Sequence, residues 1–105
     1  MKDGFYAASF TSQFGYGSGV VFLEDGIFRG GDSVIYFLGN YAVEGDAFTG
    51  EMTTNRHHFG SSMFGRDVVH LKVSGTFAGT DATLTGTTAD TPPLTLRITL
   101  KRIGD

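Results

Sequence analysis

The three histidines are the first residues to consider for metal chemistry, because imidazole nitrogens are common zinc ligands. His57 and His58 are adjacent in the sequence, so on a strand their side chains would point to opposite faces and could not hold one ion together. His70 stands apart from them, and the chain contains no cysteine. The spacing therefore predicts no metal site, and no motif in the sequence predicts a cofactor.

Serine-based hydrolysis would require a nucleophile, a histidine base and a carboxylate that orients the histidine. Ser61 and Ser62 come shortly before Asp67 and His70, and Ser12 lies in a separate predicted loop. No strained turn of the kind that presents a nucleophilic serine surrounds these residues. Most acidic residues adjoin predicted turns, where short carboxylates bond to their own backbone. We therefore expect a protein that is not an enzyme.

The stretch GGDS, residues 30–33, offers a third kind of chemistry, because consecutive backbone N–H groups can form a concave nest for an anion. The stretch lacks the lysine and the following helix of a phosphate-binding loop. The favoured interpretation is a tight corner between a short strand and a long one.

Size and charge limit the classes of function. The 105 residues predict a single domain, residues 1–105, with a formal net charge of −3. Eight basic residues are scattered along the chain, which argues against binding to nucleic acid or to a membrane surface. No apolar run approaches the roughly 18 residues of a membrane helix, and the N-terminus shows no signal-peptide pattern. We expect a soluble, cytoplasmic protein.

The elements that must position any site are predicted to be strands. Sixteen glycines and ten phenylalanines accompany short strand-like runs without a helical period. The predicted strands span about residues 5–11, 19–23, 27–29, 34–43, 47–56, 67–77, 82–88 and 94–101. Eight consecutive antiparallel strands favour a closed up-and-down barrel, because closure removes exposed sheet edges. An open sandwich is the alternative, and in either case Gly30, Gly50 and Gly86 would mark sharp bends.

One predicted strand begins with five consecutive apolar residues, VIYFL at 34–38, and is therefore apolar on both faces. Alternation places one set inside: Ile35, Phe37, Gly39, Tyr41 and Val43. The other set, Val34, Tyr36 and Leu38, then points outward. Another copy of the chain could cover this outer face, which predicts a homodimer interface. The alternative cover is the Pro92–Pro93 loop or the C-terminus.

An eight-stranded barrel either fills its interior with side chains or holds one small ligand. Phe37 and Tyr41 are predicted to line that interior. The loop at residues 57–66 contains Phe59, Met63 and Phe64, which could form a lid over a ligand or simply plug the end of the barrel. This leaves open a second function, a carrier or sensor of a small apolar molecule such as a lipid or fatty acid.

Four motifs occur in a characteristic order: MKDGFY at the start, GGDS after a short strand, YFLGNY and the acidic turn that follows. Together they resemble the GrlR-like family of negative regulators of type III secretion gene expression in attaching-and-effacing bacteria. The resemblance implies a lipocalin-like barrel, a homodimer and regulation through contact with a transcriptional activator. The family's acidic surface motif aligns with residues 44–47, of which Glu44 and Asp46 are acidic here. It predicts a non-catalytic regulatory protein that binds a protein partner through this turn.

Overall fold

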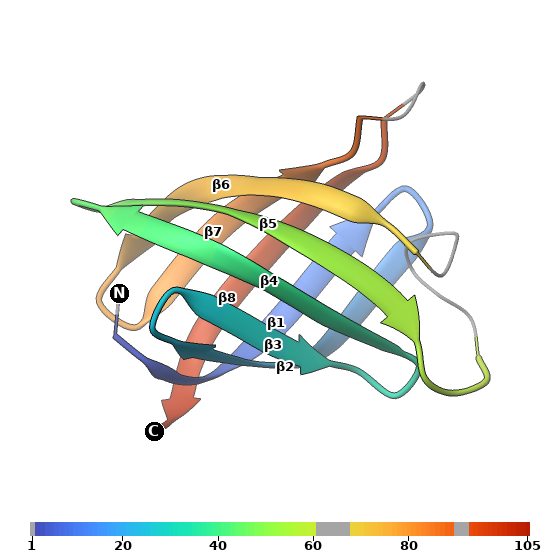
Figure 1. Ribbon diagram of the computed structural model, residues 1–105, viewed down its shortest axis with the longest axis horizontal. Coiled ribbons are helices and arrows are strands. Elements are labelled where there is room, and N and C mark those ends of the chain that lie inside the picture. Colours follow the sequence, from blue (N-terminus) through green and yellow to red (C-terminus); the bar gives the residue numbers. More distant parts are fainter. Residues whose placement is uncertain (1, 61–67, 90–92) are drawn as a thin grey trace.

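The computed structural model describes residues 2–60, 68–89 and 93–105. Within these ranges eight antiparallel strands pair in chain order, and the first strand pairs with the last to close a barrel (Figure 1). The strands are β1 (Gly4–Ser12), β2 (Gly15–Glu24), β3 (Ile27–Gly31), β4 (Ile35–Glu44), β5 (Ala47–Arg56), β6 (His70–Ala78), β7 (Asp81–Thr87) and β8 (Thr95–Gly104). The predicted eight-stranded antiparallel barrel is confirmed. No helix in these ranges is long and apolar enough to cross a lipid bilayer.

Alternation along the strands builds a single apolar core inside the barrel. Every second side chain of β8 is buried between Leu96 and Leu100, and β1 buries Tyr6, Ala8 and Phe10 in the same way. Two threonines are also buried, and both accept a backbone hydrogen bond: Thr54 from Val69, and Thr88 from Leu94. The interior is therefore apolar, with these polar groups satisfied near its end.

Glycines allow neighbouring strands to approach closely where the barrel wall curves. A Cβ atom on Gly30 would collide with the carbonyl oxygen of Val20, and one on Gly50 with that of Asn40. These two positions agree with the predicted bends. Gly86 does not, because a Cβ there would lie 3.5 Å or more from the nearest atoms, which belong to side chains.

The GGDS stretch forms the corner between β3 and β4. The Asp32 carboxylate accepts hydrogen bonds from the backbone N–H groups of Val34 and Ile35, at 2.8 and 2.7 Å. The N–H group of Asp32 in turn donates to the carbonyl of Ile35, at 2.9 Å. The corner interpretation is confirmed, and the carboxylate already occupies N–H groups that an anion-binding nest would need.

Candidate functional site

The outer face of β1 to β4 carries large apolar side chains that remain exposed. Leu38 is 53% exposed, Ile27 50% and Val20 46%. Phe22 is half-buried and packs edge-on against Phe5, with ring centroids 4.9 Å apart. We call this surface the apolar wall and define it by six residues: Phe5, Val20, Phe22, Ile27, Tyr36 and Leu38.

Strand register places the side chains of the apolar wall in neighbouring rows from β1 to β4. Phe5 on β1 lies opposite Phe22 on β2. Val20 on β2 lies opposite Gly31 on β3, and Gly31 lies opposite Tyr36 on β4. Because Gly31 has no side chain, Val20 and Tyr36 flank a shallow position between them. The wall is thus one surface across four strands.

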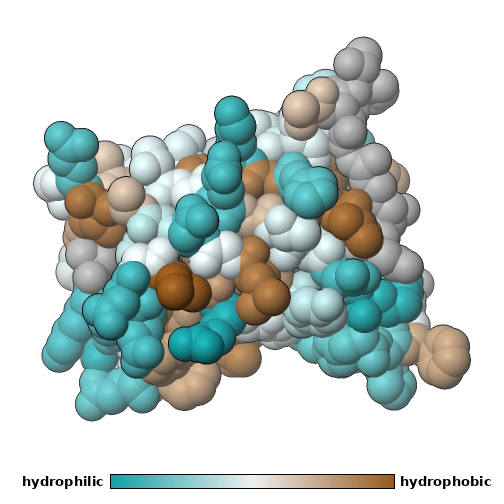
Figure 2. Space-filling view, viewed as in Figure 1, coloured by the Kyte–Doolittle hydropathy of each residue, from teal (hydrophilic) through white to brown (hydrophobic). Residues whose placement is uncertain are grey.

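The other half of the barrel has a different outer surface. Threonine and serine occupy many outward positions of β5 to β8. Among the described residues of these four strands, Ile103 is the one large hydrophobic side chain that is exposed. It lies between Arg102 and Gly104, which pair with the start of β1, so it extends the apolar wall rather than forming another. In Figure 2, brown side chains lie over β3 and β4, whereas pale and teal ones dominate over β5 and β6.

The face assignment of β4 is confirmed for most of the predicted residues. Tyr36 and Leu38 are exposed, and Phe37 is buried. They remain exposed although β8 and the rest of the described chain are in place, so these parts do not cover them. Pro92 lies outside the described residues. Val43 differs from the prediction, because it is 37% exposed at the end of the strand.

The outward prediction for Val34 is wrong. This residue precedes β4 and is partly buried against the core. Its N–H group bonds to Asp32, and its carbonyl oxygen accepts the N–H group of His57 at 2.9 Å. The corner therefore turns the Val34 side chain inward before the alternation of the strand begins.

The barrel interior contains a cavity of only about 30 Å³. Twelve apolar side chains line it, and Phe37 is among them, as predicted. Phe37 and Phe10 both line the cavity and pack edge to face, with ring centroids 5.4 Å apart and an angle of 71° between the ring planes. Ligand pockets usually measure about 300 to 1,000 Å³. The described interior is therefore too small for a lipid or fatty acid, and it gives no support to a carrier function.

Tyr41 lies at the end of the barrel where both chain termini are found. It is partly buried and stacks on Phe48, with ring centroids 5.1 Å apart at 9°. Its hydroxyl group is 3.4 Å from the Asp3 carboxylate. It is not among the residues that line the cavity, so its predicted lining role is not supported.

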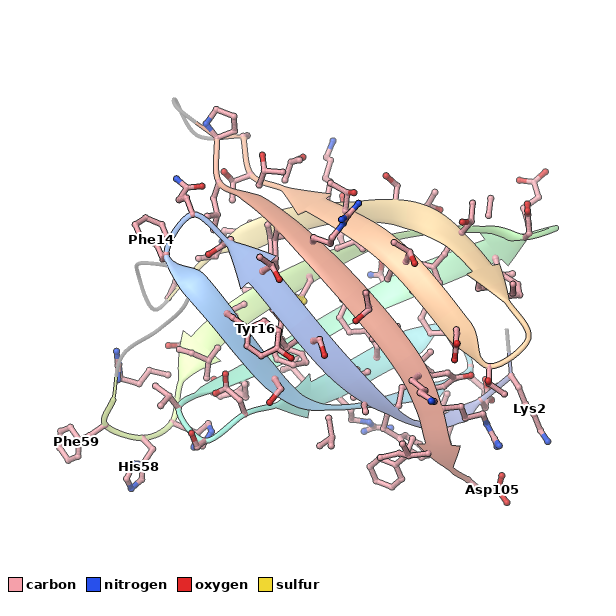
Figure 3. All side chains as sticks on the ribbon, turned by 180° about the vertical axis from the view of Figure 1, so that it is seen from behind. Lys2, Phe14, Tyr16, His58, Phe59 and Asp105 are labelled. Atoms are coloured by element: carbon pink, nitrogen blue, oxygen red, sulfur yellow. The ribbon has the colours of Figure 1, made fainter. Side chains whose placement is uncertain are left out.

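The predicted lid is described only in part, because Met63 and Phe64 lie outside the described residues. Phe59 is 90% exposed, and Figure 3 shows it with His58 at one end of the barrel, pointing away from it. His57 points back toward the corner, where its Nε2 atom is 2.9 Å from the Asp32 carbonyl oxygen. In this arrangement Phe59 covers no cavity.

The residues considered for catalysis do not form a site among those the structure describes. His70 lies on the outer face of β6, with its Nδ1 atom 3.1 Å from the Thr53 hydroxyl on β5. Ser12 accepts the N–H group of Phe14 in the β1–β2 turn. Ser61, Ser62 and Asp67 lie outside the described residues. Nor does any group of three histidine, aspartate or glutamate side chains in the described ranges have a geometry that could hold a metal ion.

The acidic turn joins β4 to β5 and projects from one end of the barrel (Figure 1). Glu44 and Asp46 are both exposed, and Gly45 between them has a φ of 63°. The Asp46 carbonyl oxygen accepts the N–H group of Phe77 at 3.0 Å, which ties the turn to β6. The two predicted carboxylates are therefore presented to solvent on an anchored hairpin.

A polar cluster at the same end of the barrel was missed by the sequence reasoning. The Asp3 carbonyl oxygen accepts two hydrogen bonds from the Arg102 guanidinium, which also pairs with Asp105. The Tyr6 hydroxyl donates to the carbonyl of Lys2. Burial raises the pKa of Tyr6, and the bond from Arg102 lowers the pKa of the Asp105 carboxyl. These residues come from both ends of the chain, so no local pattern could indicate the cluster.

Comparison with known proteins adds no assignment. No protein-family model matches the sequence, and no curated protein matches it.

Proposed function

We propose that this protein is a non-catalytic interaction protein that forms a homodimer through the apolar wall. The observation that carries the proposal is the asymmetry of the barrel surface: exposed large apolar residues of the described strands gather on β1 to β4, with Ile103 beside them. Contiguous patches of several hundred Å² on soluble proteins commonly mark interaction sites. A second copy of the chain offers a cover of the same chemistry.

The size of the wall fits a small dimer interface. Six large side chains, each exposed by roughly half or somewhat less, present about 400 Å² of apolar surface per copy. At about 25 cal/mol per Å², burying the walls of two copies would gain about 20 kcal/mol before the loss of rigid-body freedom and side-chain entropy is subtracted. Polar residues around the wall would bring the contact to the lower part of the usual 1,200–2,000 Å² range.

The test is the oligomeric state of Leu38→Asp. Leu38 is 53% exposed on the wall, so the new carboxylate is solvated in the monomer and would be buried without a partner in the dimer. We expect sedimentation equilibrium to show a dimer for the wild type and a monomer for the variant, with unchanged far-UV circular dichroism.

The matched control is Thr85→Asp. Thr85 is exposed on β7, which lies four strands from β3 in either direction around the barrel. The Thr85→Asp substitution adds the same negative charge as Leu38→Asp but away from the wall, so we expect this variant to remain dimeric. A wild type that stays monomeric at high concentration, or a Leu38→Asp variant that stays dimeric, would contradict the proposal.

We further propose that the dimer acts as a regulator by binding a protein partner through the acidic turn. The support is the resemblance to the GrlR-like family together with the exposure of Glu44 and Asp46 on an anchored hairpin. The two turns of a dimer would give a partner two equivalent acidic contacts. We expect a partner captured from the source cells by the wild type to be lost with the double variant Glu44→Lys and Asp46→Lys. Equal capture by both proteins would exclude the turn as the binding site.

A further inference from the structure

Two charged side chains interrupt the apolar wall. Arg29 on β3 lies opposite Phe22 on β2 and Leu38 on β4. Glu24, at the end of β2, lies opposite Ile27 on β3. The two side chains are 57% and 52% exposed, so both would be covered if another molecule lay against the wall.

Within one copy these two residues form only a loose pair. The Nη2 atom of Arg29 is 3.9 Å from the Oε1 atom of Glu24, beyond the distance of a hydrogen bond. A guanidinium has five N–H donors, and most of those of Arg29 remain available to a second carboxylate. An exposed pair of this kind contributes little to the stability of the monomer.

The position of Arg29 becomes important when the wall is buried. A guanidinium covered by an apolar surface without a well-placed carboxylate would strongly destabilise the contact. The wall carries one positive and one negative group side by side, so it is complementary in charge to another copy of itself. In a two-fold contact, if residue i of one copy meets residue j of the other, then j also meets i.

We infer that Arg29 of each copy binds Glu24 of the partner subunit, so that two symmetry-related ion pairs fix the orientation of the dimer. This inference rests on the proposed function, since it needs the apolar wall to be the dimer contact. The apolar side chains supply the area of the interface, and the ion pairs exclude orientations in which Arg29 would face Ile27 or Leu38 of the other copy.

Charge reversal at position 29 or position 24 distinguishes an ion pair between two copies from an ion pair within one copy. In Arg29→Glu the wall carries two acidic groups, and in Glu24→Arg it carries two basic groups. Each variant should therefore repel a copy of itself, and we expect its dimer Kd to rise about tenfold or more. An equimolar mixture should form heterodimers with a Kd near that of the wild type, because each copy then meets the opposite charge at both positions.

Sedimentation equilibrium measures the Kd of each variant, and native mass spectrometry of the mixture counts homodimers and heterodimers. Arg97→Glu is the matched control, since Arg97 is exposed on β8 outside the wall and undergoes the same change of charge. We expect this control to dimerise like the wild type and to show no preference in mixtures.

If both reversed variants dimerise like the wild type and mix in statistical proportions, the ion-pair assignment is overturned while the dimer stands. If the wild type is monomeric, both the inference and the proposed function fail. A mixture in which heterodimers predominate, while each variant alone is weakened, supports the inference.

Discussion

At Gly30 the backbone of the neighbouring strand occupies the space that a side chain would need. A Cβ atom there would collide with the carbonyl oxygen of Val20, and the barrel wall cannot relax freely because both strands are paired on each side. Gly86 appeared equivalent in the sequence, because both glycines follow an aspartate and a short strand. The structure distinguishes them, since the three atoms nearest to a Cβ on Gly86 belong to the side chains of Leu71, Ile98 and Val73.

A pair of alanine substitutions tests this difference. Gly30→Ala should destabilise the protein by about 1–3 kcal/mol, because the new methyl group forces the strands apart. Gly86→Ala should be neutral or stabilise it by up to about 1 kcal/mol, because the methyl group fills free space and the unfolded chain loses conformational freedom. Urea unfolding followed by circular dichroism measures both. Equal destabilisation by the two variants would show that position 86 also requires glycine.

At the scale of the element, β4 shows what alternation can and cannot predict. From Ile35 to Leu38 the buried and exposed side chains alternate as the sequence pattern predicted, because Ile35 is paired with β5 and the next three residues are paired with both β3 and β5. Val34 broke the pattern because it belongs to the corner that Asp32 holds, not to the strand. The start of β2 was predicted too late, at Gly19, because glycines such as Gly15 and Gly17 are not typical of a strand, yet both pair regularly with β1.

The alternation of β4 makes Phe37 and Leu38 differ sharply in what a charge would do. Phe37→Asp should abolish folding, because it removes a ring that packs on Phe10 and buries a carboxylate in an apolar core. The expected loss of more than about 4 kcal/mol is a large part of the 5–15 kcal/mol typical of a domain. Circular dichroism and proton spectra of the purified variant would show the loss of native structure. Leu38→Asp serves as the comparison, and a folded Phe37→Asp would show that the interior tolerates charge.

At the scale of the whole molecule, residues far apart in the sequence close one end of the barrel. Asp3, near the N-terminus, contacts Tyr41 from the middle of the chain and Arg102 from β8, which pairs with β1. The Tyr6 hydroxyl is buried beneath this cluster and donates to Lys2. The cluster joins the first and last strands. Because the Tyr6 hydroxyl can donate its hydrogen bond only while it is protonated, the stability of this end should depend on the protonation of Tyr6.

Alkaline pH should therefore destabilise the folded protein through this end of the barrel. Burial raises the pKa of Tyr6 above its ordinary value of 10.0 in the folded protein, so folding favours the neutral phenol. The contribution of Tyr6 to the free energy of unfolding is fully present below pH 10 and is lost as the pH rises through the raised pKa. We expect the urea midpoint to fall above pH 10, and to fall less steeply in Tyr6→Phe. The control is Tyr16→Phe, at a side chain that is 70% exposed, and its urea midpoint should vary with pH as that of the wild type does. If the midpoint of Tyr6→Phe fell as steeply as that of the wild type, Tyr6 would not be the cause of the alkaline loss of stability.

Residue patterns along the chain were enough to predict the all-β class, the number and order of the strands, the interior face of β4 and the outward position of Tyr36 and Leu38. These features follow from local alternation and turn residues, which act over a few neighbouring positions. The folded barrel was needed to show that side chains nearly fill the interior, that Val34 turns inward, and that Arg29 and Glu24 share one apolar wall. Those features depend on register and closure between distant strands, and a one-residue change of register would reverse every face.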